Sequence, residues 1–262
     1  MNVALFGYNR PEHTRKTLEA LKQSFYDGGV IHLECYLDGT DAENQAVNDV
    51  ILEYMDMPFT FNINRAGERR ELRTAVEEGL DDFFGKFDRG IVLEDDIVVS
   101  PYFVEFMRNS LYLYEEDENI FSICSFMQPS LAGPADTVLL PRTHSWGWAT
   151  WADKWKLYDP DLDLQAIKDL GKNFNCGHLN LVEACLDRPQ WAVRWYYTQY
   201  KHHGLSLFPT KSLSINIGMD RTGYNCDPRN PKHSYCDEPI PLIYKDTIDL
   251  KLYAEYLRTN RW

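Results

Sequence analysis

Four strand-like runs in the first hundred residues, apolar or alternating and each ending in a polar turn, constrain the fold of this 262-residue chain more than any other feature. The runs lie at 3–6, 31–37, 59–63 and 91–96, and segments with helical periodicity separate them. Strands that alternate with helices in this way are typical of an α/β protein with a largely parallel sheet and helices on both faces. The carboxyl ends of these four strands would then meet at one edge of the sheet.

Polar side chains occupy all four turns at this predicted edge. Ligands of open α/β sheets bind outside the carboxyl ends of the strands, so we expect a binding site where these turns converge. The residues in the turns are Tyr8, Asn9 and Arg10 after the first run, Asp38 after the second, Asn64 and Arg65 after the third, and Glu94, Asp95 and Asp96 at the end of the fourth.

The triplet Glu94, Asp95 and Asp96 is the most unusual of these turns. Adjacent carboxylates at the end of a buried strand repel one another and lose hydration, which a bound cation would relieve. Oxygen ligands suit Mg²⁺ or Mn²⁺, and such an ion usually also binds substrate phosphates. A solvated acidic turn is the alternative. Because three other polar turns share the edge, we favour the metal site.

A helix is predicted from about residue 68 to residue 84, with Arg69, Arg70 and Arg73 in its first turns. Cations at a helix N-terminus oppose the helix dipole. A nearby anion would explain their position, and ordinary surface arginines are the alternative.

The composition limits the partners and the compartment. Acidic residues outnumber basic ones, 40 to 27, so nucleic acid is not an expected partner. We expect neither a signal peptide nor a membrane-spanning helix, which leaves open a peripheral contact with a membrane. The six cysteines form no Cys-x-x-Cys pair and are expected to be free thiols in the cytoplasm. A zinc site of Cys226, Cys236 and His233 is the alternative, although its spacing fits no common zinc module.

Tryptophans are concentrated in the stretch 145–155, which holds four of the seven in the chain. A glycine between two tryptophans suits a loop in which Trp146, Gly147 and Trp148 face a ligand, and a packed cap is the alternative. An aromatic helix is predicted for 190–201. Its Arg194 would bind a phosphate or an acidic sugar, or would stack on Trp195.

Taken in order, these motifs resemble nucleotide-sugar glycosyltransferases of the GT-A fold. The acidic triplet is similar to the metal-binding motif of the N-acetylglucosaminyltransferase I family, and the stretches 145–151, 191–195 and 216–220 resemble bacterial sugar transferases of the same superfamily. The resemblance spans most of residues 1–226. It implies a Rossmann-like, mostly parallel central sheet in one GT-A domain over residues 1–262, in which 1–100 bind the nucleotide sugar and 101–262 form an aromatic-rich acceptor side.

The resemblance also implies roles for the polar turns. Tyr8, Asn9 and Arg10 would line the nucleotide, and Asp38 would bind the edge of the base. Contacts to ribose or phosphate would come from Asn64 and from Arg65 or Arg73.

The metal ligand that the resemblance implies is Asp96, with Glu94 and Asp95 touching sugar or ribose. The ion, Mn²⁺ or Mg²⁺, would stabilise the departing nucleoside diphosphate. Related bacterial sequences carry a histidine where this chain has Asn225, so a second protein ligand is in doubt.

A catalytic base cannot be carried over from the family, because the segment 191–195 holds no acidic residue. An inverting transfer needs a carboxylate to deprotonate the acceptor hydroxyl, whereas a retaining transfer does not. The candidates are Asp153, Asp187 and Asp220, and Asp220 ranks first because it lies in a polar, glycine-containing loop. A turn cap is the alternative role for Asp220.

The sequence thus predicts a metal-dependent glycosyltransferase that moves a sugar from a nucleoside-diphosphate sugar, with a UDP-sugar as the first candidate, to a glycan or lipid-linked acceptor in surface polysaccharide assembly. Two alternatives stay open. A sugar-nucleotide nucleotidyltransferase would require a glycine-rich, basic loop after the first strand, which this chain lacks. A non-catalytic sugar-binding protein of the same fold would not need the acidic triplet.

Overall fold

The computed structural model describes residues 1–25, 29–55, 59–161, 163–170, 174, 181–183, 190–220, 222 and 234–259. Within these residues, a central sheet has the order β3-β2-β1-β4-β8-β6-β9-β7, and β10 pairs with β5 in a smaller one. The strands are β1 (Asn2–Gly7), β2 (Ile31–Leu37), β3 (Phe59–Arg65), β4 (Arg89–Glu94), β5 (Ile97–Val99), β6 (Ile120–Cys124), β7 (Thr137–Leu140), β8 (Trp148–Trp151), β9 (Leu205–Pro209) and β10 (Ser214–Asn216).

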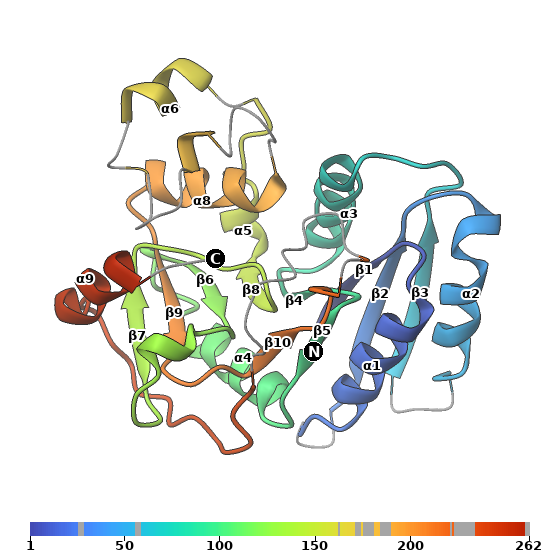
Figure 1. Cartoon of the computed structure of the whole chain (residues 1–262), viewed down its shortest axis with the longest axis horizontal. Coiled ribbons are helices and arrows are strands. Elements are labelled where there is room, and N and C mark those ends of the chain that lie inside the picture. The colour runs from blue at the N-terminus through green and yellow to red at the C-terminus, as the bar shows by residue number, and fades with distance from the viewer. Residues whose placement is uncertain are drawn as a thin grey trace.

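The helices connect and cover these strands. Figure 1 shows α1 and α2 beside β1–β3 on the right, and α8 above β6 and β9 on the left. The helices are α1 (Pro11–Lys22), α2 (Asp41–Leu52), α3 (Leu72–Lys86), α4 (Phe103–Leu113), α5 (Ala152–Trp155), α6 (Leu164–Leu170), α8 (Trp191–Lys201) and α9 (Leu250–Thr259), with the short 3₁₀ helix η1 (Pro129–Leu131).

The first half of the sheet confirms the predicted alternation. Strands β3, β2, β1 and β4 are all parallel, and Val3 lies between Leu33 of β2 and Ile91 of β4. Helix α2 begins with a capping box, in which Thr40 accepts from the backbone of Glu43 and the Glu43 side chain accepts from the backbone of Thr40. The four polar turns therefore follow strands that end at the same edge.

The tryptophan-rich stretch differs from the expected loop. Trp148–Trp151 form β8, which enters the central sheet antiparallel to both β4 and β6. The expectation of a loop is wrong for these residues, because their pairing partners lie far away in sequence: Val92 opposite Trp148 and Ile91 opposite Ala149. Gly147, just before β8, has a φ of +77° and lets the chain turn into the sheet.

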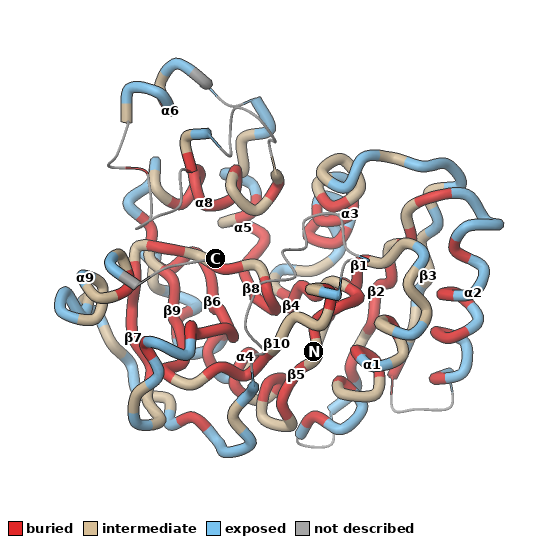
Figure 2. The backbone as a smooth tube through the Cα atoms, in the orientation of Figure 1, coloured by how far each residue is buried: buried red, intermediate tan, exposed pale blue. Residues whose placement is uncertain are grey.

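Apolar side chains cover both faces of the central sheet, as predicted. Figure 2 shows buried residues along the strands and exposed ones on the outer sides of α2 and α6. Alternate residues of β1 point to opposite faces. Val3 and Leu5 join the core with α1, α2 and α4, whereas Ala4 and Phe6 join the core with α3, α5 and α8.

A third core lies beneath α6, α8 and α9, where Tyr196 and Tyr197 pack with Phe174 and Tyr256. The segment before α9 is fastened by Lys245, whose Nζ donates to the Asp136 carboxylate at 2.9 Å. Of the helices in the described ranges, none has the length and hydropathy that crossing a bilayer requires.

Candidate functional site

A cleft of about 1460 Å³ opens at the carboxyl ends of β1–β4 and continues to α8 on the other side. Most residues selected from the sequence line it, although they come from distant parts of the chain. These residues are Tyr8, Asn9, Arg10, Asp38, Asn64, Arg65, Arg73, Glu94, Asp95, Asp96, Trp146 and Trp148.

Arginines gather in the cleft, although its lining also holds about as many acidic side chains. Its lining includes Arg69, Arg70 and Arg142, in addition to the three arginines named above. Arginine binds phosphate through a planar fork of N–H donors. An anionic ligand can therefore be held locally by a chain whose formal net charge is −13.

The acidic triplet and Arg10 form the floor of the cleft. Arg10 lies in the turn between β1 and α1, and its guanidinium forms ion pairs with Asp95 and with Asp96, the latter at 2.9 Å. Asp95 is also fixed through its backbone, since the hydroxyl of Thr17 donates to its carbonyl oxygen at 2.8 Å. The sequence predicts a cation at these two carboxylates, and the guanidinium of Arg10 provides that positive charge.

Glu94, the first acid of the triplet, stands at the end of β4 and lines the cleft. Burial, together with the neighbouring Asp96 and Asp95, raises the pKa of Glu94 to about 8. The protonated form of Glu94 is therefore favoured relative to an ordinary carboxyl. It can donate a hydrogen bond into the cleft and adds little repulsion toward an anion.

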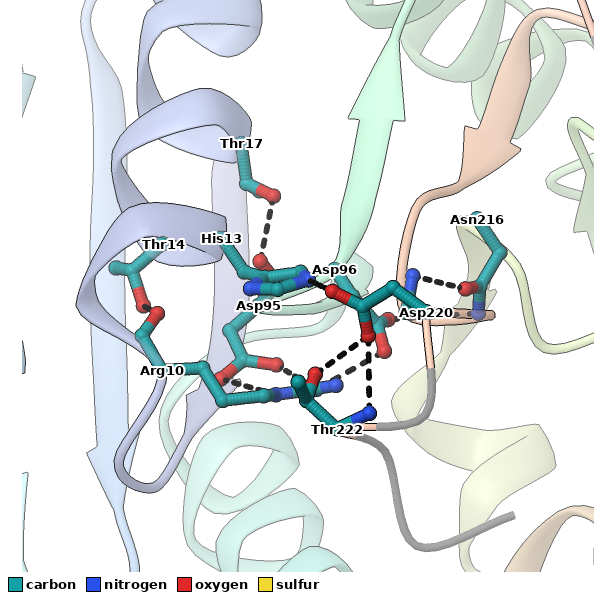
Figure 3. Close-up of polar contacts among 10 residues, drawn as sticks. Arg10, His13, Thr14, Thr17, Asp95, Asp96, Asn216, Asp220 and Thr222 are labelled. Carbon is teal, nitrogen blue, oxygen red and sulfur yellow. Dashed lines mark hydrogen bonds and ion pairs between the residues drawn. The ribbon is translucent and has the colours of Figure 1, made fainter. Parts of the chain in front are cut away.

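The loop after β10 closes over this floor (Figure 3). Ile217 donates its backbone N–H to the carbonyl oxygen of Asp96 at 2.9 Å, and the Asn216 amide lies 3.5 Å from Oδ1 of Asp96. A Cβ added to Gly218 would stand 2.1 Å from Oδ2 of Asp96. Only glycine fits at this position, because the backbone of the loop lies directly against the carboxylate.

Asp220, the first-ranked candidate base, lies at the end of the same loop. Its Oδ2 is 3.2 Å from Nε2 of His13 on α1, and its Oδ1 accepts from the backbone and hydroxyl of Thr222 (Figure 3). The hydrogen bonds from Thr222 lower the pKa of Asp220. The carboxylate is therefore charged at neutral pH and is held beside the floor of the cleft.

The wall formed by the first two strand ends is built around Tyr8. Arg69 lies over the Tyr8 ring at 5.1 Å, and the Tyr8 hydroxyl donates to Glu43 at 2.5 Å. Gly39 has a φ of +94°, and a Cβ there would meet the Tyr8 ring at 2.6 Å. Beside it, the Asp38 carboxylate accepts from the backbone N–H of Arg70 at 2.8 Å. The base-binding residue expected from the resemblance is thus already engaged with the loop before α3.

That loop corrects one prediction. Helix α3 begins at Leu72 rather than near residue 68, and its N-cap residue, Glu71, makes no side-chain capping bond. Arg69 and Arg70 therefore precede the helix and only Arg73 lies in its first turn. The local sequence has no cap signal at residue 71, so the sequence pattern predicts a helix start that is too early.

Asn64 is positioned by a buried carboxylate at the third strand end. Its amide donates to Glu34 at 2.9 Å, and Asn62 and Lys86 donate to the same oxygen. Glu34 is 2% exposed, so this network stabilises a buried charge by several hydrogen bonds. Arg65, the next residue, is not part of this network, because its guanidinium donates to the side chain of Asn48.

Tryptophans on the opposite side pack mainly against one another. The Trp148 ring stacks on Trp191 at 5.7 Å and contacts Trp195 at 5.6 Å. Trp195 in turn donates its indole N–H to Ser122 at 2.9 Å. This cluster fixes α8 against β8, so the packing interpretation of the tryptophans describes Trp148 well, although part of Trp148 also lines the cleft.

Arg142 and His144 were not selected from the sequence, yet both line this side of the cleft. The guanidinium of Arg142 lies 3.9 Å above the ring of Tyr196. Each sits a few residues before the tryptophan stretch. Their position next to that stretch is the signal in the sequence that could have indicated a place in the cleft.

Besides Asp220, three described residues that the sequence singles out are not part of the cleft lining. Arg194 is buried in α8 and donates to the carbonyl oxygen of Pro160, and Gly147 is buried just before β8. Asp153 is exposed on α5, next to Lys154. Asp187, like the proposed zinc ligands Cys226 and His233, lies outside the described residues.

The predicted Mn²⁺ or Mg²⁺ does not fit the floor as it is arranged. Carboxylate oxygens are suitable donors, but Oδ2 of Asp96 is covered by Arg10 and Gly218, and Oδ1 faces the amide of Asn216. No group of three or more His, Cys, Asp or Glu side chains within the described part of the chain is placed to hold a metal ion.

Comparisons with known proteins bear on the fold. No family model matches the sequence, and no curated protein is similar to it in sequence. Among solved structures, residues 1–349 of S. aureus TarS are similar with a TM-score of 0.52 and 9% identity, over 84% of this chain and 62% of that one. The fold is therefore of the GT-A type, a mixed α/β fold with a large central sheet, as the sequence predicts.

Two further structures are similar over shorter stretches. The mannosyltransferase PcManGT from Pyrobaculum calidifontis, in complex with GDP-Man and Mn²⁺, has a TM-score of 0.40 and 13% identity, over 65% of this chain and 46% of that one. S. aureus TarS 1–349 in complex with UDP-GlcNAc has a TM-score of 0.43 and 9% identity, over 64% and 47%. This chain thus spans less than two thirds of each of these proteins.

Proposed function

We propose that this chain is a glycosyltransferase that takes its sugar from a nucleoside-diphosphate sugar, with a UDP-sugar as the first candidate. The observation that carries the proposal is the convergence of four strand ends and five arginines on one wall of the cleft. Strand ends of this kind bind nucleotides in open α/β sheets. Arginines supply the charge that a diphosphate requires. The GT-A fold and the motif resemblance agree with it.

In this proposal the two sides of the cleft have different tasks. Tyr8 and Asp38 hold the nucleoside, and the neighbouring arginines bind the diphosphate. Trp146 and Trp191, on the opposite side, offer apolar ring surface of the kind that packs against sugar rings. The sugar to be transferred would lie between them, above the acidic triplet. Residues 1–100 would then serve the donor and 101–262 the acceptor.

For an inverting transfer we propose Asp220 as the base that accepts the proton of the acceptor hydroxyl. Among the candidates in the described residues, it lies beside the floor of the cleft, whereas Asp153 does not. A divalent ion would bind Asp96 only by displacing Arg10, so no step of the transfer is assigned to a metal. The acceptor we infer from the resemblance is a glycan or lipid-linked carrier in cytoplasmic steps of surface polysaccharide assembly.

The proposal is tested by titrating UDP, GDP and dTDP, and their sugars, into the chain by calorimetry, and by following release of free sugar and nucleoside diphosphate without acceptor. We expect one nucleotide to bind and its sugar donor to be hydrolysed slowly. A nucleotidyltransferase would instead make pyrophosphate from a nucleoside triphosphate and a sugar 1-phosphate. Binding of sugars without any nucleotide binding would favour the non-catalytic alternative.

A further inference from the structure

Arg10 occupies the position between Asp95 and Asp96 that a cation at the acidic triplet would take. Its Nη2 contacts both carboxylates, and its Nε lies 3.4 Å from Oδ2 of Asp95. The three residues belong to two neighbouring strand ends, since Arg10 follows β1 and the carboxylates follow β4. One guanidinium therefore bridges two acids that would otherwise repel each other.

Backbone contacts hold this arrangement from several sides. The antiparallel pairing of β10 with β5 places Asn216 opposite Ile97, next to the triplet. It brings the backbone of Gly218 against Oδ2 of Asp96, where the added Cβ of any other residue would lie 2.1 Å away. A metal ion at this oxygen would have to displace both Arg10 and the loop. The backbone of the loop thus adds to the side-chain contacts that close the floor.

The charges of the floor are balanced by the same contacts. Side chains of Asp95 and Asp96 are only 4% and 11% exposed, so their charges need a partner close by. Burial acts against the charge of Arg10, but Asp95 and Asp96 outweigh it and raise the pKa of Arg10 above its ordinary value. The guanidinium thus carries a permanent charge at every physiological pH.

Arg10 also has donor capacity left for a ligand. Its Nη1 is buried and has no hydrogen-bond partner among the described residues, and the side chain lines the cleft. A buried donor without a partner is costly unless a ligand satisfies it. The oxygens of a diphosphate are acceptors of the right charge, and the remaining edge of the guanidinium is suited to them.

We propose that Arg10 replaces the divalent metal ion of the acidic triplet, so that the diphosphate of the donor binds this chain through a guanidinium and without Mn²⁺ or Mg²⁺. This inference rests on the proposed function, because it names how the same cleft holds a nucleoside diphosphate. Asp95 and Asp96 are then positioning residues: they orient Arg10 and do not coordinate an ion.

The test compares nucleoside-diphosphate binding by calorimetry in EDTA and in Mn²⁺, for the wild type, Arg10→Gln and Arg10→Lys. In the wild type we expect dissociation constants that agree within about twofold in the two buffers. Arg10→Gln should weaken binding in EDTA by about tenfold or more, since a charge-assisted contact is lost. Mn²⁺ should restore part of the affinity that Arg10→Gln loses, because the freed carboxylates can then bind an ion. Arg10→Lys should keep an intermediate affinity.

A matched control is Arg15→Gln, which removes an arginine of α1, the helix that follows Arg10, and whose partner, Glu53, lies outside the cleft. It should bind like the wild type. A second readout is thermal unfolding without nucleotide: Mn²⁺ should raise the midpoint of Arg10→Gln and leave that of the wild type unchanged. If Arg10→Gln does not fold, the wild type in EDTA and Arg10→Lys carry the test.

The outcomes separate the two proposals. Wild-type binding that disappears in EDTA and returns with Mn²⁺ or Mg²⁺ overturns the inference about Arg10 and leaves the proposed function intact. A chain that binds no nucleoside diphosphate in either buffer overturns the proposed function, and the inference with it. A wild type whose unfolding midpoint rises in Mn²⁺ alone contradicts the closed floor directly.

Discussion

Nε2 of His13 lies 3.2 Å from Oδ2 of Asp220, and this contact ties the first turn of α1 to the loop after β10. The histidine side chain is 13% exposed and the aspartate 45% exposed. The contact thus lies at the rim of the floor, where water still reaches the carboxylate.

Replacing His13 by Ala should loosen that loop without disturbing the core. A partly exposed pair of this kind contributes about 0.2–1 kcal/mol, so we expect nucleotide affinity to fall by up to about fivefold. Calorimetry measures the change, and Glu12→Gln, at the exposed neighbouring position, serves as the control. An affinity equal to that of the wild type would show that the loop does not depend on this contact.

Gly218→Ala tests the close approach of the loop to the carboxylate. The new Cβ would stand 2.1 Å from Oδ2 of Asp96 and 3.0 Å from Nη1 of Arg10, so the floor has to shift. Overpacking of this kind costs about 1–3 kcal/mol, and we expect nucleotide affinity to fall by about tenfold. Gly133→Ala is the matched control, because a Cβ at Gly133 meets nothing within 4 Å. Equal affinity for both variants would mean that the loop moves freely.

Trp195→Phe tests the tryptophan cluster. The change removes the indole N–H that donates to Ser122 at 2.9 Å and leaves a buried hydroxyl without its donor. We expect the free energy of unfolding to fall by about 2 kcal/mol. Adding Ser122→Ala should recover part of the loss, because the unpaired hydroxyl is then gone. Strictly additive losses in urea unfolding would indicate that the hydrogen bond contributes nothing.

Glu34 gives a pH-dependent prediction. Burial acts to raise the pKa of Glu34, but the hydrogen bonds from Asn64, His32, Asn62 and Lys86 outweigh it and hold the pKa below 4.5. A carboxyl whose pKa is lowered by folding stabilises the protein above its unfolded pKa, and this stabilisation is lost as the pH falls through the folded value.

The difference in unfolding free energy between the wild type and Glu34→Gln should therefore be largest near neutral pH and shrink below about pH 4. Denaturant unfolding at several pH values measures it. Glu116→Gln, at an exposed position, should show little such trend. A difference that does not change with pH would mean that Glu34 has the same pKa in both states.

Much of the fold was predictable because the first half of the chain is locally consistent. Each of β1–β4 has the sequence pattern of a strand and is followed by a polar turn, and α2 carries a capping box at Thr40. Their parallel pairing then brings the four turns together without further information. The cleft and most of its donor-side residues follow from this rule alone.

Features that depend on distant partners could not be predicted. The stretch Trp148–Trp151 is buried on every side and shows no alternation, so only its pairing with β4 and β6 defines it as a strand. Arg10 and Asp95 are 85 residues apart, and nothing local links their charges. The sequence therefore indicated that the triplet needs a cation, but it could not indicate that Arg10 is the one.

The position of β8 has a consequence for how the chain can be divided. Within the described ranges, β4 meets the second half of the sheet only through β8, with Ile91 opposite Ala149 and Val92 opposite Trp148. A fragment that ends before residue 148 would leave β4 as an open edge whose backbone N–H and C=O groups invite pairing with other chains. Such a fragment should aggregate rather than bind nucleotide, so the donor side of the cleft depends on residues that are synthesised much later.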